Sequence, residues 1–102
     1  MTPEEIVSVI ESYEELLTIM GVSKIRMDQE KSFGSLSSGE ILAHAHFLCD
    51  DAKKYATNPE QFGKANRHLT AIQMCLSFAN IYTLGELMDH NRPEIPEQKT
   101  TA

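Results

Sequence analysis

Apolar residues recur every three or four positions between residues 6 and 20, with glutamate and serine between them. This spacing gathers the apolar residues on one side of a helix and is typical of an amphipathic helix packed on a core. Thr2-Pro3-Glu4-Glu5 precedes the pattern and reads as a capping box, and Gly21 follows it as a typical helix stop. We therefore predict a helix over about 3–20.

A second amphipathic pattern follows the capping box Ser37-Ser38-Gly39-Glu40 and stops at Asn58, because the residue before a proline avoids helical backbone angles. A third apolar segment begins at once, with Asn58 placed to cap it and Pro59 at its first position. We predict helices over about 40–57 and 59–80. The very short turn between them forces an antiparallel hairpin.

Another capping box, Thr83-Leu84-Gly85-Glu86, predicts a short helix over about 84–90. His90-Asn91-Arg92-Pro93 closes that helix, with the asparagine suited to a left-handed turn. The polar chain that follows predicts a flexible tail over 93–102. The predicted fold is all-α: one helical domain over 1–92, a small bundle built on the antiparallel hairpin.

Residues 22–36 have no clear period, and no second extended segment is present to pair with them. We predict a loop that packs Ile25, Met27 and Phe33 against the helices.

The helix over 59–80 is apolar on nearly all sides. Its main stripe consists of Phe62, Ala65, Leu69, Ile72, Leu76 and Ala79. At about 100° per residue, Met74 and Phe78 lie on the opposite face. A single small domain has few elements with which to cover both faces, and an apolar face left open is an interaction site. We therefore predict a homo-oligomer or a partner protein at Met74 and Phe78.

The chain of 102 residues has 9 Lys and Arg against 15 Asp and Glu, for a formal net charge of −6. This balance argues against general affinity for nucleic acid, which needs a basic surface. Residues 1–20 contain five glutamates and no base, so the first helix forms an acidic wall. Two interpretations of that wall stay open: a solvated helix face and a contact surface for a basic partner.

No apolar run approaches the roughly 20 residues of a membrane-spanning helix. The first residues are acidic and do not resemble a targeting segment. The two cysteines fall among apolar helix positions, which is typical of proteins from reducing compartments. We expect a cytoplasmic protein that has no membrane partner.

Residues capable of catalysis or metal binding form no strong pattern. His46, Cys49 and Asp50 share one helix face, yet no further metal ligand has suitable spacing. Cys75 and His68 are about 10 Å apart by helical rise, too far for the hydrogen bond that activates a nucleophile. We therefore predict no enzyme activity, no metal and no cofactor.

Basic and amide side chains form the remaining candidate site, for a partner or a small anionic ligand. They are Lys24, Arg26, Asn66, Arg67 and His68. Asn66, Gln73 and Asn80 also recur every seven residues along the edge of the apolar stripe. These amides either satisfy one another or a facing helix, or they line a cleft between subunits and contact a ligand.

Two segments carry a resemblance to known proteins: Lys64-Ala65-Asn66-Arg67-His68-Leu69, and IYTLGELMDHNRP at residues 81–93. Together with the helix between them they resemble small uncharacterised proteins encoded by tailed bacteriophages, over about the last third of the chain. The resemblance implies a phage accessory protein in the host cytoplasm. The hairpin also resembles, in architecture alone, phage sponge proteins, which are oligomers that sequester signalling nucleotides of host immunity between subunits.

The sequence therefore supports two hypotheses about function. The first is a non-enzymatic phage accessory protein that inhibits or modulates a host protein through a helical surface, either the acidic first helix or the face with Met74 and Phe78. The alternative is an oligomeric sponge that sequesters a nucleotide-like signalling anion of host defence. Its ligand would contact Lys24, Asn66, Arg67 and His68.

Overall fold

A computed structural model describes residues 1–92 of the chain, which form four α-helices. They are α1 (Pro3–Ile19), α2 (Ser38–Ala56), α3 (Phe62–Phe78) and α4 (Leu84–His90), with short 3₁₀ turns η1 (Phe33–Ser35) and η2 (Pro59–Gln61). No strand occurs within this part of the chain. The predicted all-α bundle is therefore confirmed. The predicted tail over 93–102 lies outside the described residues.

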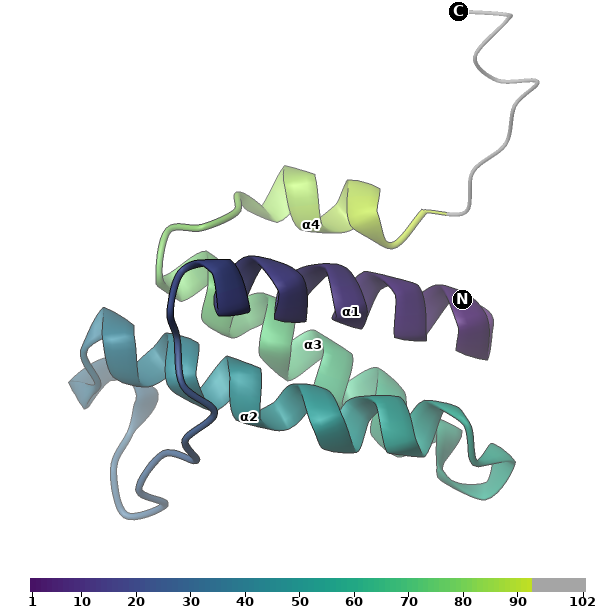
Figure 1. The fold of residues 1–102 in the computed structure, drawn as a ribbon, viewed down its shortest axis with the longest axis horizontal. Helices are drawn as coiled ribbons and strands as arrows, with labels where there is room; N and C mark the ends of the chain where they lie inside the picture. The colour runs from purple at the N-terminus through teal and green to yellow at the C-terminus, as the bar shows by residue number, and fades with distance from the viewer. Residues whose placement is uncertain (93–102) are drawn as a thin grey trace, which may run out of the picture.

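The α2–α3 hairpin is the framework of the fold, and its two helices run antiparallel (Figure 1). The Asn58 side chain accepts a hydrogen bond from the Glu60 N–H at 3.1 Å and donates one to Gln61 Oε1 at 2.9 Å. The prediction that the helix begins at Pro59 was wrong by one turn. Residues 59–61 form η2, because Asn58 caps a tight 3₁₀ turn before α3 starts.

Three capping boxes fix the starts of α1, α2 and α4, as the sequence predicted. In each box the first residue's hydroxyl accepts from a backbone N–H, and the glutamate three residues later accepts from the first residue's N–H. The hydrogen bond from the backbone of the capping residue is the main cause that lowers the pKa of Glu5, Glu40 and Glu86. These helix starts are thus set by local chemistry.

The core forms where α1 lies across the hairpin and contacts both of its helices (Figure 1). From α1 it takes Ile6, Ile10, Tyr13 and Leu17, all almost fully buried. From α2 it takes small side chains: Ala45, Cys49, Ala52 and Ala56. Small residues allow α3 to approach α2 closely, and α3 fills the space with larger groups such as Leu69, Ile72 and Leu76.

A buried polar cluster attaches α4 to α1 and α3. The Gln73 amide donates to the Tyr13 hydroxyl at 3.1 Å and exchanges two hydrogen bonds with the Asn91 amide, at 2.7 and 3.1 Å. Because the Tyr13 oxygen accepts from Gln73, its own proton is free for Nδ1 of His90, 2.7 Å away. Burial raises the pKa of Tyr13. These hydrogen bonds pair the polar side chains at the contact between α4 and the core.

The three amides that recur every seven residues have separate structural positions. Gln73 belongs to the buried cluster, Asn66 donates to a carbonyl of its own helix at 3.2 Å, and Asn80 takes a left-handed backbone with φ 62°. The prediction of a left-handed Asn91 was wrong, since its φ is −87° and its side chain is committed to Gln73. The helix stop predicted at Gly21 is confirmed, and its backbone is left-handed there, with φ 77°.

The segment between α1 and α2 is held by polar bonds more than by packing. The Ile25 N–H donates to the Ala43 carbonyl at 3.2 Å, and the Met27 N–H donates to Nδ1 of His44 at 3.1 Å. Met27 is half-buried, and the Phe33 ring lies 5.9 Å from the His44 ring. The Ile25 side chain is 60% exposed, so the prediction that it packs against the helices was wrong.

The buried cluster can be tested by removing one hydroxyl. We expect Tyr13→Phe to lower the free energy of unfolding by about 1–3 kcal/mol, because buried Gln73 and half-buried His90 each lose a hydrogen bond to its hydroxyl. Urea unfolding followed by circular dichroism measures this change. Tyr55→Phe is the matched control: the Tyr55 hydroxyl has no hydrogen bond within residues 1–92, and we expect a change below about 0.5 kcal/mol. Equal losses in the two variants would contradict the cluster's role.

Candidate functional site

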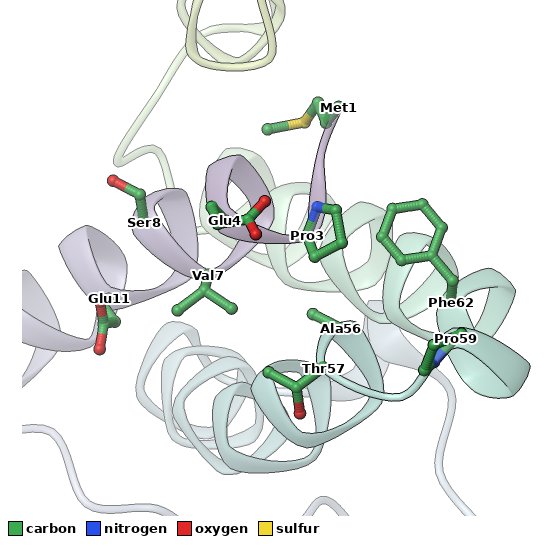
Figure 2. Close-up of a pocket in the computed structure, with 10 residues that line it drawn as sticks. All are labelled: Met1, Pro3, Glu4, Val7, Ser8, Glu11, Ala56, Thr57, Pro59 and Phe62. Carbon is green, nitrogen blue, oxygen red and sulfur yellow. The ribbon is translucent and has the colours of Figure 1, made fainter.

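An open groove separates the first turns of α1 from the turn that joins α2 to α3 (Figure 2). Its volume is about 820 Å³. Pro3 and Val7 lie on the α1 side, opposite Ala56, Pro59 and Phe62 on the hairpin side. The walls are therefore apolar on both sides, in a size range typical of binding pockets.

Two carboxylates stand at the edge of this groove. Glu4 and Glu11 line it together with Ser8, all three from α1. None of the residues lining the groove is Lys, Arg or His. Glu4 and Glu11 form no ion pair within residues 1–92. The acidic wall predicted for the first helix thus borders a concave apolar surface.

A second cavity, of about 670 Å³, lies between residues 26–33, the outer side of α2 and His68 of α3. It brings together Arg26 and His68, two of the predicted binding residues, and adds Lys31 and His44. Nδ1 of His44 accepts from the Met27 backbone, so its proton in the neutral ring is on Nε2. Burial, then the positive charges of Arg26 and His68, lower the pKa of His44 and favour that neutral ring.

Aromatic rings line the same cavity along α2. The Phe47 ring stacks on His44 with centroids 6.2 Å apart and an interplanar angle of 16°. Farther along the helix, Tyr55 meets His68 edge-on at 5.1 Å, and Lys64 Nζ lies 5.4 Å from the Tyr55 centroid. The cavity therefore combines flat apolar surfaces with hydrogen-bond donors and cations.

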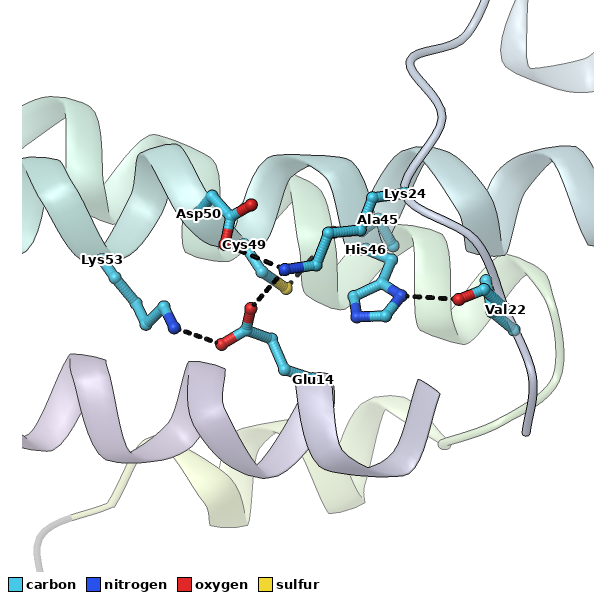
Figure 3. A network of polar contacts seen from close by, with 8 residues as sticks. All are labelled: Glu14, Val22, Lys24, Ala45, His46, Cys49, Asp50 and Lys53. Atoms are coloured by element: carbon cyan, nitrogen blue, oxygen red, sulfur yellow. Dashed lines mark hydrogen bonds and ion pairs between the residues drawn. The ribbon is translucent and has the colours of Figure 1, made fainter. Parts of the chain in front are cut away.

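An ion-pair network occupies another part of the surface, between α1, α2 and the loop (Figure 3). Lys24 contacts Asp50 at 2.9 Å and Glu14 at 3.1 Å, and Lys53 contacts the other oxygen of Glu14. The hydrogen bond to Asp50 is the main cause that raises the pKa of Lys24, and the bond to Glu14 raises that of Lys53. Lys24, a predicted binding residue, is thus engaged in the fold and does not line the cavity with Arg26 and His68.

The histidine and cysteines considered for metal binding or nucleophilic chemistry are buried. His46 bonds the Val22 carbonyl through Nδ1 at 2.9 Å, and its Nε2 has no partner (Figure 3). Burial raises the pKa of Cys49 to about 12 and that of Cys75 to about 11, so both thiols stay protonated at neutral pH. Within residues 1–92 no group of three or more His, Cys, Asp or Glu side chains is arranged to hold a metal ion.

The outer face of α3 is exposed, as the helical spacing predicted. Met74 is 40% and Phe78 58% exposed, and Arg67 lies on the same side of the helix at i−7 from Met74. Nothing within residues 1–92 covers this face. The predicted homo-oligomer, for which Met74 and Phe78 are the proposed contacts, stays a prediction.

No family model, curated protein or solved structure matches the chain. Among the described helices none has the length and apolarity to cross a bilayer.

The groove is the site that sequence patterns missed. Val7 lies beside the apolar stripe of α1 and Phe62 is the first residue of the stripe of α3, and each is only partly buried by the core. Their meeting depends on how α1 crosses the hairpin, which no local pattern specifies. The glutamates of α1 predicted an acidic surface on this helix. They did not predict the concave apolar surface beside it.

The contribution of the ion-pair network to stability can be tested at Glu14. We expect Glu14→Gln to lower the free energy of unfolding by about 1–2 kcal/mol, because Lys24 and Lys53 lose the shared carboxylate charge and one of them faces an amide NH2 instead of an acceptor. The raised lysine pKa values mean that this contribution is full below the ordinary lysine value of 10.5 and is lost as the pH rises through the folded-state values. Unfolding curves at neutral and alkaline pH measure it. Glu15→Gln, an exposed charge with no ion pair within residues 1–92, is the control; an equal loss there would contradict the network.

Light scattering tests whether the outer face of α3 joins copies of the chain. We expect the wild-type protein to exceed the mass of one chain, and the double variant Met74→Glu/Phe78→Glu to return to that mass, because charges do not pack at an apolar contact. Ser12→Glu, which adds a charge at an exposed position of α1, should keep the wild-type mass. A wild-type protein with the mass of one chain would rule out self-association at this face.

Proposed function

We propose that this protein acts by binding a partner protein and catalyses no reaction. The observation that carries the proposal is the groove beside α1, which is apolar inside and acidic at its edge. A partner that fits such a surface presents an amphipathic segment with basic residues. Docking an amphipathic helix in an apolar groove is a common mode of peptide recognition.

Charge supports a basic partner over an acidic one. Glu4 and Glu11 are free of internal ion pairs in residues 1–92, and the whole chain carries a formal charge of −6. Complementary charges at the rim of an interface accelerate association and exclude partners of the wrong sign. The apolar walls, including Val7 and Phe62, then supply the surface that a partner buries.

The proposal of a phage accessory protein that modulates a host protein rests on the C-terminal resemblance. In that segment Tyr82 packs against Tyr13 and His90, Leu87 is buried, and Asn91 bonds Gln73. These residues maintain the fold, so the resemblance bears on shared architecture more than on a shared binding site.

The positions of the four predicted ligand contacts give less support to the oligomeric sponge. Of the four side chains assigned to its ligand, His68 lines the cavity, whereas Lys24 is in ion pairs and Asn66 donates to its own helix. Arg67 is exposed on α3 and does not line the cavity.

Affinity capture from a bacterial lysate with two matched variants tests the groove. We expect Glu4→Gln/Glu11→Gln to recover much less of the wild type's partner, because the edge of the groove loses both charges. The control Glu15→Gln/Glu30→Gln removes two exposed charges elsewhere and should recover the partner normally. Raising the salt concentration should weaken the wild-type complex and the control alike.

Two results would contradict the proposal. One is a partner that both double variants retain equally, since the groove charges would then be irrelevant. The other is the absence of any partner with wild-type protein whose circular dichroism confirms that it is folded. Identification of a strongly acidic partner would overturn the charge argument as well.

A further inference from the structure

The cavity beneath residues 26–33 has a chemistry distinct from that of the groove. Its cationic lining groups are Arg26 and Lys31, with the imidazoles of His44 and His68, in a chain whose formal charge is −6. Arg26 forms no ion pair within residues 1–92, and Lys31 meets Glu40 only at 3.7 Å. An unpaired guanidinium beside the free Nε2–H of His44 is suited to an anion.

The neutral His44 ring adds a directed donor. Its Nδ1 is occupied by the Met27 N–H at 3.1 Å, which leaves Nε2–H as the free polar group of a side chain that is 9% exposed and lines the cavity. A hydrogen-bond donor that is largely removed from water gains more from an acceptor than an exposed one does. His44 therefore complements Arg26 at the same end of the cavity.

The cavity is elongated, and the half farther from Arg26 is also aromatic. From His44 to Tyr55 the α2 backbone rises about 16 Å, with Phe47 near one end and the Tyr55–His68 pair at the other. Flat side chains along this length offer stacking surfaces for a planar ring. A ligand that fills the site thus carries a ring as well as a charge.

The single lining carboxylate, Asp51, orients such a ligand. Asp51 is one turn from Tyr55 along α2, so it disfavours negative charge in the aromatic half and accepts hydrogen bonds from ring N–H groups. The anionic group belongs at Arg26 and His44, and the ring belongs farther along α2, on the aromatic side chains that begin with Phe47. One charged end and one heteroaromatic end describe a nucleoside monophosphate better than a polyphosphate.

We propose that this cavity binds a planar heteroaromatic monophosphate, with the phosphate at Arg26 and His44 and the ring against the aromatic side chains of α2. The site is separate from the groove, so the two proposals stand or fall independently.

Two-dimensional ¹H–¹⁵N NMR titration with adenosine monophosphate tests this site. We expect shifts in the amides of residues 26–33, and around His44, Tyr55 and His68. Adenosine and inorganic phosphate, each carrying half of the chemistry, should bind at least about tenfold more weakly. The same spectra report whether each variant is folded.

Two variants locate the charge. Arg26→Gln should weaken adenosine monophosphate at least about tenfold, because it removes a charged hydrogen-bond donor. Lys54→Gln removes an equal charge from an exposed α2 position outside the cavity, and its affinity should match that of wild type.

Several results would overturn the assignment. Shifts confined to the groove residues, or no shifts at millimolar ligand, would exclude binding in the cavity. If adenosine bound as tightly as adenosine monophosphate, the phosphate would contribute nothing to binding. If inorganic phosphate bound as tightly, the ring would contribute nothing. If Arg26→Gln and Lys54→Gln weakened the binding of adenosine monophosphate equally, the overall charge of the protein would explain the loss, without a specific contact at Arg26.

Discussion

The position of α1 on the hairpin depends on one buried hydroxyl. Of the four α1 side chains that enter the core, Tyr13 alone carries a hydrogen-bonding group, and it joins Gln73 of α3 to His90 of α4. Apolar burial drives the association, but it is non-directional. Hydrogen bonds in a low-dielectric interior fix one arrangement, since leaving any member unpaired is costly. The shape of the groove depends on how α1 sits on the hairpin, because α1 forms the acidic side of the groove.

Local chemistry explains which features could be predicted. The helix starts follow from residues three apart, and the hairpin follows from the Asn58-Pro59 turn, so the sequence contains their causes at short range. The bonds of Tyr13 reach residues 60 and 77 positions away. No periodicity encodes such partners. The seven-residue spacing therefore does not distinguish Gln73 from Asn66 and Asn80. For the same reason Lys24 and Arg26, two residues apart in one loop, have different surroundings, an ion-pair network and a cavity.

The groove and the cavity differ in the sign of the charges that line them. Glu4 and Glu11 line the groove beside α1, and no Lys, Arg or His side chain does, whereas Arg26 and Lys31 line the cavity under the loop with one carboxylate. Opposite signs on two sites select different partners, since like charges across an interface are unfavourable. The network around Glu14 pairs Lys24 and Lys53 and leaves Glu4, Glu11 and Arg26 without ion pairs in residues 1–92. A protein partner in the groove and an anion in the cavity are therefore compatible on one chain.

Site-specific photo-crosslinking tests the binding account most directly. A photoreactive residue replaces Ser8, which is exposed within the groove, or Thr70, which is exposed on α3 outside it. Irradiation of intact bacterial cells that express each protein then captures whatever lies within reach. The account predicts a discrete adduct of larger mass from position 8 and none of the same mass from position 70. Adducts from position 70 alone would contradict it and place the contact on α3.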